Sequence, residues 1–345
     1  MPVEKSFPEP LRCEPSSGIH KHTIIFLHGR GGSADTFGPA LLGTTFLGAD
    51  ATSDSTQHGC TEVSVQPAQY NSCPTTLVQV FPHARFVFPA APKLRATVYK
   101  RSIIRQWFDD WHLGFTADRV DSRYDLGLQT TGLGSTVAYL HDLITEEAEL
   151  VGGTRNVVLG GISQGCVASL VASLLWEGTN GLGGVAGMCG WLPYISQMRE
   201  QLLGGDVSEA RDFAVEKCHD EEEAGFDPFD RSAPTCSGGA SADETDGEGS
   251  VEATLKWLRD EIEVPARRAV SSSAPISSTP VMLCHGQADE KVAIAKARET
   301  TEFLTTISMG PLRFKEYAGV EHDFSSQMIS DIAGFLQDVL GQTSN

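Results

Sequence analysis

Short apolar runs alternate with amphipathic stretches over most of this 345-residue chain. The apolar runs show no in–out alternation, which is typical of strands buried on both faces of a parallel sheet. They predict strands over 20–27, 85–90, 157–159, 184–193 and 312–317, and over 280–289 a strand that ends in a loop, with His285 in its exit turn. Apolar segments of helical length predict helices over 36–42, 130–150, 166–176, 290–307 and 326–340. This alternation indicates an α/β protein with a mostly parallel central sheet and helices on both faces.

Three stretches interrupt the alternation. Residues 1–19 are proline-rich and are interpreted as an N-terminal arm. Residues 44–76 are polar without a period, which indicates a long surface loop. Residues 197–278 form an acidic insertion whose composition is typical of disorder, although 251–264 places its apolar residues on one helical face. We therefore expect one α/β domain over 20–341, preceded by the arm and interrupted twice.

The charge of the chain is strongly negative. The formal net charge is −19, and segment 206–252 contributes −12 of it, with fifteen Asp and Glu against three Lys and Arg. Proteins that bind nucleic acids normally carry a basic surface. The composition therefore argues against a nucleic-acid partner.

Cysteine spacing and hydropathy bear on metal binding and on cellular location. The eight cysteines form no C-x-x-C pair and no Cys–His spacing suited to zinc, so no metal site is expected. The N-terminus lacks the apolar core of a signal peptide, and no apolar run approaches membrane-spanning length. We therefore expect a cytoplasmic protein with at most peripheral membrane contact.

A candidate nucleophile lies between a predicted strand and a predicted helix. The residues Gly161-Ile162-Ser163-Gln164-Gly165 fit the pattern G-x-S-x-G, in which a strained turn exposes a serine hydroxyl. Glycines flank such a serine because the strand and the helix approach each other closely. An ordinary tight turn is the alternative. The flanking buried strand and apolar helix favour the nucleophile.

A serine nucleophile needs a base, and the base needs a carboxylate to orient it. Asp289 ends one predicted strand and His322 follows the next, so both fall at the carboxyl edge of the sheet. With Ser163 they give the order Ser, Asp, His of an α/β-hydrolase. Capping of the following helix is the alternative for Asp289. Asp109 and Asp110 are rival carboxylates, but they precede the serine.

The loop from His28 to Asp35 is glycine-rich and joins a strand to a helix. It lacks the spacing of a phosphate-binding loop, which leaves that interpretation weak. A loop that offers backbone donors to an oxyanion fits better. We expect His28 to stabilise the turn around Gly29 and to transfer no proton.

Six motifs, in this order along the chain, resemble those of the acyl-protein thioesterase / phospholipase–carboxylesterase family of the α/β-hydrolase superfamily. They are Phe26-Leu27-His28-Gly29-Arg30-Gly31, Gln106-Trp107-Phe108-Asp109, Gly161-Ile162-Ser163-Gln164-Gly165, Gly190-Trp191-Leu192-Pro193, Cys284-His285-Gly286-Gln287-Ala288-Asp289 and Gly319-Val320-Glu321-His322. The resemblance implies an α/β-hydrolase fold and a cofactor-free serine hydrolase. It implies a triad of Ser163, His322 and Asp289, with the backbone N–H groups of Arg30 and Gln164 as oxyanion donors.

The resemblance also implies the substrates, which are carboxyl esters and acyl thioesters, including palmitoylated proteins and lysophospholipids. The candidate substrate-binding residues are Ile103, Ile104, Trp107, Phe108, Trp191 and Leu192. Ordinary core packing is the alternative for the two isoleucines and for the first aromatic pair.

The expected function is therefore that of an acyl-protein (palmitoyl-protein) thioesterase or a carboxylesterase. Two alternatives stay open, which are a lysophospholipase and a non-catalytic hydrolase-fold module that recruits partners through the acidic insertion. The expected partner is an acylated protein, a small ester or a lysophospholipid. The acyl chain length, the leaving group and the oligomeric state are left open.

Overall fold

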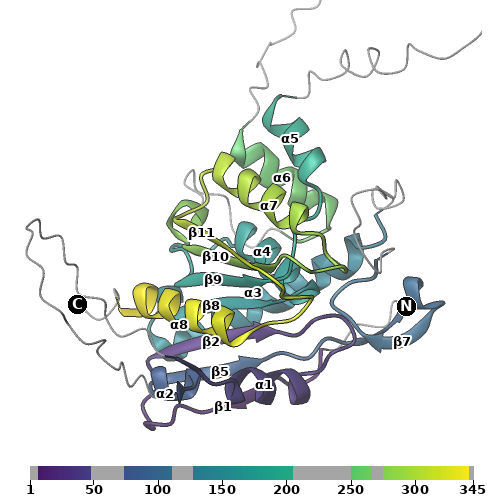
Figure 1. Cartoon of the computed structure of the whole chain (residues 1–345). Helices are drawn as coiled ribbons and strands as arrows, with labels where there is room; N and C mark the ends of the chain where they lie inside the picture. The colour runs from purple at the N-terminus through teal and green to yellow at the C-terminus, as the bar shows by residue number, and fades with distance from the viewer. Residues whose placement is uncertain (1–6, 48–73, 111–126, 205–249, 266–274, 342–345) are drawn as a thin grey trace, which may run out of the picture. The chain divides into compact units, whose positions relative to one another are not determined.

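The computed structural model describes residues 7–47, 74–110, 127–204, 250–265 and 275–341. Their main feature is a seven-stranded sheet in the order β1-β5-β2-β8-β9-β10-β11 (Figure 1). Its strands are β1 (Leu11–Cys13), β2 (His22–Leu27), β5 (Ala84–Phe88), β8 (Val157–Ile162), β9 (Gly184–Met188), β10 (Val281–Gly286) and β11 (Leu312–Tyr317). Only β1 runs antiparallel to its neighbour in this sheet. The predicted α/β architecture with a mostly parallel sheet is confirmed.

The described helices are α1 (Ala34–Gly43), α2 (Leu77–Val80), α3 (Thr130–Val151), α4 (Gln164–Leu174), α5 (Ile195–Leu202), α6 (Val251–Glu261), α7 (Ile294–Thr306) and α8 (Ser326–Gly341). Four of them, α1, α3, α4 and α8, pack on the two faces of the sheet. On one face α1 and α8 share a core with side chains such as Phe26 and Phe86. On the other, α3 and α4 pack against each other and against β2 and β8. Alternate side chains of each buried strand supply the two cores.

Two predicted elements end or begin elsewhere for local backbone reasons. The strand expected over 184–193 stops at Met188, because Cys189 has a φ of +48°, outside the extended region. The helix expected over 290–307 begins only at Ile294. The backbone N–H groups before it are instead bound by the carboxylate of Asp289.

The structure also contains short elements that no periodic pattern predicts. Residues 11–13 of the expected arm form β1 at the edge of the sheet. At the ends of the expected 44–76 loop, β3 (Phe46–Leu47) pairs with β4 (Pro74–Thr75). The remainder of that loop, 48–73, lies outside the described residues.

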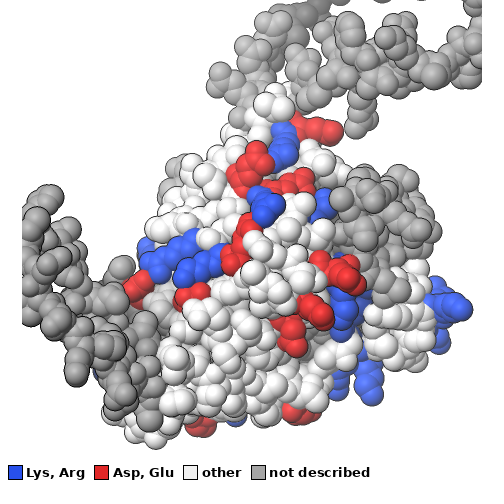
Figure 2. Space-filling view, in the orientation of Figure 1, with Lys and Arg blue, Asp and Glu red and all other residues white. Residues whose placement is uncertain are grey.

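A second hairpin joins β6 (Lys93–Ala96) to β7 (Ser102–Arg105). Residues 93–105 hold five basic and no acidic residues, although the chain as a whole is acidic. Figure 2 shows basic side chains gathered where Figure 1 places this hairpin. The hairpin is thus a basic element of an acidic protein.

The chain divides into two compact units, residues 1–195 with 258–345, and residues 196–257. The sheet and every predicted site residue belong to the first unit. The second unit contains most of α5 and the first part of α6, which lies within the predicted helix 251–264. Most of the predicted acidic insertion, 205–249 and 266–274, lies outside the described residues. Among the described helices, none has both the length and the apolar character needed to cross a membrane.

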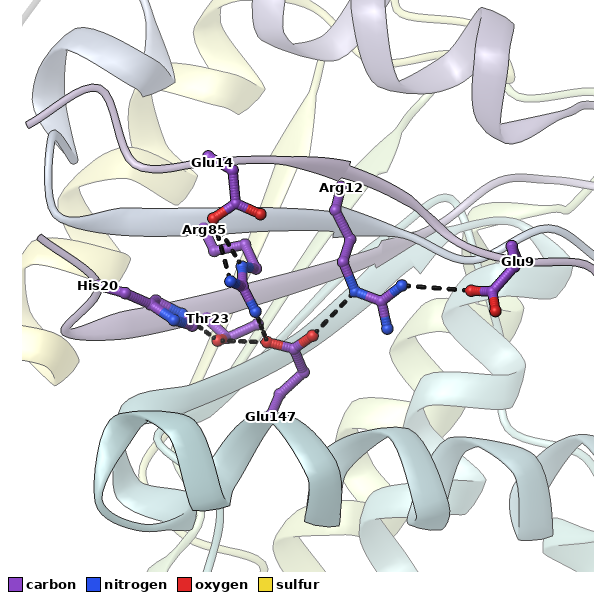
Figure 3. Close-up of polar contacts among 7 residues, drawn as sticks. All are labelled: Glu9, Arg12, Glu14, His20, Thr23, Arg85 and Glu147. Atoms are coloured by element: carbon purple, nitrogen blue, oxygen red, sulfur yellow. Dashed lines mark hydrogen bonds and ion pairs between the residues drawn. The ribbon is translucent and has the colours of Figure 1, made fainter. Parts of the chain in front are cut away.

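A buried carboxylate ties the edge strand to the body of the first unit (Figure 3). Glu147 of α3 is 1% exposed and accepts a hydrogen bond from Arg12 of β1 at 3.2 Å. Its other oxygen accepts from Arg85 of β5 at 3.2 Å and from the Thr23 hydroxyl of β2 at 3.1 Å. One helix residue therefore holds three strands.

Removal of this carboxylate is expected to destabilise the protein. In Glu147→Ala, Arg12 and Arg85 keep their positive charges without the buried partner. We expect the free energy of unfolding to fall by about 3 kcal/mol, the lower end for a broken buried pair, because both arginines retain some solvent contact. Urea unfolding measures the change. The exposed neighbour Glu146→Ala should change stability by only about 0.5 kcal/mol, and equal losses in the two variants would contradict this assignment.

Candidate active site

Ser163 occupies a sharp turn between β8 and α4. Its backbone has φ +57° and ψ −124°, outside the regions that non-glycine residues favour, and its N–H donates to the carbonyl of Met188 at 2.9 Å. The turn brings α4 against β2. A Cβ on Gly161 or Gly165 would lie 2.6 or 2.4 Å from the carbonyl oxygen of Leu27, so only glycine fits at either position.

His322 lies between the serine and an aspartate. Its Nε2 is 2.9 Å from Ser163 Oγ, and its Nδ1 is 2.7 Å from Asp289 Oδ2. Because an ionised carboxylate only accepts hydrogen bonds, Nδ1 carries the hydrogen and Nε2 accepts from the serine hydroxyl. The structure thus brings together the three residues that the sequence singled out, from positions 126 and 33 residues apart along the chain.

Asp289 forms hydrogen bonds both to the backbone turn that follows it and to His322. Its Oδ1 accepts the backbone N–H groups of Lys291 and Val292, each at 2.9 Å, while Oδ2 faces His322. Burial alone would raise the pKa of Asp289, but hydrogen bonds from His285 and His322 and from the Val292 N–H outweigh it and lower that pKa below its usual range. The carboxylate is therefore ionised wherever the protein is folded near neutral pH.

The glycine-rich loop lies beside the serine. A Cβ on Gly29 would be 3.4 Å from Ser163 Cβ. His28 Nδ1 donates to the carbonyl of Gly29 at 2.7 Å, and its Nε2 accepts the N–H of Ala91 at 3.1 Å. Burial lowers the pKa of His28 to about 4, so the ring is neutral and fills both roles. The expected turn-stabilising role of His28 is confirmed.

Side-chain contacts hold the two residues predicted to supply oxyanion donors. The guanidinium of Arg30 pairs with Asp110 at 2.8 Å. The amide of Gln164 accepts the N–H of Trp107 at 3.3 Å and donates to the carbonyl of Phe108 at 3.0 Å. Gln164 is also the first residue of α4, where backbone N–H groups have no partner within the helix. Neither side-chain contact can be predicted from hydrophobic periodicity or from a sequence motif.

A family model described as Phospholipase/Carboxylesterase matches residues 67–225 and 263–340, more than half of the chain. The chain belongs to this family. The matched residues include the serine, the aspartate and the histidine of the site, whereas the glycine-rich loop lies outside the match.

Curated relatives carry related names. Acyl-protein thioesterase 1 of Yarrowia lipolytica is 27% identical over 186 residues, which cover 54% of this chain and 64% of the relative. Carboxylesterase SOBER1 of Arabidopsis thaliana is 32% identical over 119 residues, which cover 34% of this chain and 48% of the relative. Each alignment thus spans less than two thirds of the relative's own length.

Solved structures share the fold. Acyl-protein thioesterase 2 of Zea mays superposes with a TM-score of 0.56 at 18% identity, covering 96% of this chain and 99% of that one. Arabidopsis thaliana SOBER1 gives a TM-score of 0.53 at 18% identity, with 92% and 99% covered. These likenesses place the phospholipase/carboxylesterase chain in the α/β-hydrolase fold, as predicted.

The predicted substrate-binding residues of this family member differ widely in exposure. Trp107 and Phe108 are 1% and 0% exposed, and Trp107 Nε1 donates to the carbonyl of His28 at 2.7 Å, so the Trp107 ring supports the glycine-rich loop from the interior. Trp191 and Leu192 are also buried. Ile104 is half-buried, and Ile103 is exposed on the β6–β7 hairpin. Substrate contact by any of the six stays a prediction.

The rival carboxylates have structural partners instead. Asp109 accepts from the backbone N–H and the hydroxyl of Thr97 at 2.9 and 2.6 Å, and Asp110 pairs with Arg30.

One group of metal-binding residue types occurs within the described part of the chain. The thiol of Cys189 lies within 4.8 Å of ligand atoms of Asp289 and His322. Burial raises the pKa of this thiol to about 12, so it is a neutral group near the site. Asp289 and His322 already bond to each other, an arrangement that suits proton transfer better than metal ligation.

Proposed function

We propose that this protein is a serine hydrolase that cleaves carboxyl esters and acyl thioesters through a triad of Ser163, His322 and Asp289. One observation carries the proposal. A continuous chain of hydrogen bonds runs from the serine hydroxyl through the imidazole to an ionised carboxylate. The strained serine at the N-terminus of α4 adds support, because this geometry exposes a nucleophile beside backbone donors.

In the first half-reaction His322 Nε2 takes the proton of Ser163 Oγ while Oγ bonds to the substrate's carbonyl carbon. The carbonyl oxygen becomes an oxyanion, which the backbone N–H groups of Arg30 and Gln164 stabilise in this proposal. Collapse of the tetrahedral intermediate breaks the C–O or C–S bond. His322 returns the proton to the leaving alkoxide or thiolate, and the acyl group stays on Oγ.

In the second half-reaction water replaces the leaving group. His322 Nε2 takes a proton from water, and the resulting hydroxide attacks the acyl carbon. The second tetrahedral intermediate uses the same oxyanion donors. Its collapse releases the carboxylic acid and returns the proton to Ser163 Oγ. Asp289 keeps the imidazole in the required tautomer and stabilises its protonated form throughout.

The substrate class follows from the relatives. Curated relatives named acyl-protein thioesterase and carboxylesterase support an acylated protein or a small ester as substrate. The family description also supports a lysophospholipid as the second candidate. The expected cytoplasmic location and the absence of a cofactor requirement stay predictions.

A covalent probe tests the proposal directly. We expect a fluorophosphonate to label the wild-type protein at Ser163, with peptide mass spectrometry identifying the modified residue. Turnover of p-nitrophenyl esters of increasing chain length, a palmitoylated peptide and a lysophosphatidylcholine then ranks the substrates. Absence of both labelling and turnover in a folded protein would favour the binding-module alternative.

A further inference from the structure

A second histidine contacts the aspartate of the site. His285, near the end of β10, is 1% exposed, and its Nε2 lies 3.3 Å from Asp289 Oδ2. The same oxygen accepts the Nδ1–H of His322 at 2.7 Å. His285 Nε2 also lies 2.8 Å from the carbonyl oxygen of Val292. The aspartate is thus bounded by two imidazoles on one oxygen and by two backbone N–H groups on the other.

These contacts determine where the hydrogen of His285 resides. A carbonyl oxygen and an ionised carboxylate oxygen can only accept, so the Nε2 that faces both must carry the hydrogen. The shorter contact of that hydrogen is to Val292 O at 2.8 Å, and Asp289 Oδ2 at 3.3 Å is its second, longer acceptor. In the neutral ring, Nδ1 is then left with a lone pair.

The Nδ1 atom of His285 is buried, and none of the described residues forms a hydrogen bond with it. A buried polar atom without a partner is costly, so a histidine that only fills core space would be a poor choice here. An aliphatic side chain would fill the space without that cost. An aliphatic side chain, however, would supply no hydrogen-bond donor at the position of Nε2.

We propose that His285 is a positioning residue, whose Nε2–H holds Asp289 Oδ2 in place and moderates its pull on His322. The proposal rests on the proposed function. A donor that shares the carboxylate oxygen withdraws negative charge from it, and this makes His322 a weaker base. The same donor restrains rotation of the carboxylate, whose other oxygen is already bound by the turn.

The titratable groups around this cluster keep a constant charge near neutral pH. Glu316 of β11 lies opposite His285 in the strand register and is held in a surface ion pair. The thiol of Cys189 lies on the other side of Asp289, and burial raises its pKa to about 12. Neither Glu316 nor Cys189 therefore changes its charge between pH 5 and 8.

Replacement of the donor should alter both rate and pH dependence. We expect His285→Leu to lose about tenfold in kcat, the equivalent of one hydrogen bond of about 1.4 kcal/mol. The acid limb of its kcat/KM profile should move up by about half a pH unit, because His322 becomes a stronger base. In His285→Gln the amide nitrogen reaches the Nε2 position, so the rate and the profile should stay close to those of the wild type.

A matched control separates positioning from packing. His141 of α3 is also buried, and its Nε2 lies 2.8 Å from the backbone carbonyl of Ala172, away from the site. His141→Leu should change stability without moving the pH profile. If His285→Leu does not fold, His285→Asn provides the test, because its shorter amide reaches the Nδ1 position and should behave as a donor loss.

The first measurement is kcat/KM for a short-chain ester from pH 5 to 9. The second is the NMR proton resonance of His322 Nδ1–H, which reports on the hydrogen bond to Asp289 and does not depend on turnover. A shifted resonance and acid limb in the Leu or Asn variant, with recovery in the Gln variant, support the proposal. Unchanged profiles and resonances in an active protein overturn the role of His285 alone. A wild-type protein that hydrolyses no ester overturns the proposed function and this role with it.

Discussion

A Ser163→Ala protein is expected to fold like the wild type and to lose about 10⁶-fold in kcat for every ester and thioester substrate. The hydroxyl is the only group removed, and its oxygen lies 2.9 Å from His322 Nε2. Alanine tolerates the turn no worse than serine, because both carry a Cβ at the same positive φ. Substrate turnover, thermal unfolding and fluorophosphonate labelling measure the three consequences.

The control for this variant is Ser173→Ala, in α4, the helix that follows Ser163. Ser173 is buried, and its hydroxyl donates to the carbonyl of Ser169 at 2.8 Å, away from the imidazole. This variant should keep near-normal turnover and full labelling. Near-normal turnover in a well-folded Ser163→Ala protein would refute the nucleophile assignment.

The second large effect concerns Asp289. We expect Asp289→Asn to cut kcat by about 10⁴-fold while the fold is retained. The N–H groups of Lys291 and Val292 require an acceptor at the Oδ1 position, so the amide oxygen stays there and the amide nitrogen faces His322. Nδ1 must then accept, which moves the ring hydrogen to Nε2. An Nε2 that carries a hydrogen cannot take the proton of Ser163.

Asp109→Asn is the matched control for that substitution. Asp109 accepts hydrogen bonds from Thr97 rather than from a proposed catalytic residue, so its loss should affect kcat by less than about tenfold. Turnover and urea unfolding of both variants provide the comparison. A larger loss of kcat in Asp109→Asn than in Asp289→Asn would show that Asp289 is not the carboxylate that orients His322.

The positions of the three proposed catalytic residues were predictable because their signals are local. The close approach of α4 to β2 excludes a Cβ at two positions, which leaves a recognisable glycine spacing around Ser163. Asp289 follows β10 and His322 follows β11, and parallel strands bring such loops to one edge of the sheet. A chain that alternates buried runs with helices therefore predicts both the sheet and the residues at its edge.

The supports of the site were not predictable in the same way. Gln164 is the variable position of the serine motif, yet its amide holds the backbone of Trp107 and Phe108. His285 read as part of a strand's exit turn, and only the folded chain brings its Nε2 to Asp289. Each of these contacts depends on side-chain reach across the site, which residue spacing does not encode.

The sequence by itself determined which segments are buried, and with them the α/β class, the elbow at Ser163 and the carboxyl-edge positions of its partners. Hydropathy reports burial along each segment, and backbone restrictions act on neighbouring residues, so both are readable locally. The tertiary structure alone decided that residues 11–13 join the sheet, because a three-residue strand has no period. They are held by Glu147, which lies 135 residues from its partner Arg12 along the chain. Such contacts arise only when the packing of distant elements brings charged groups together out of water.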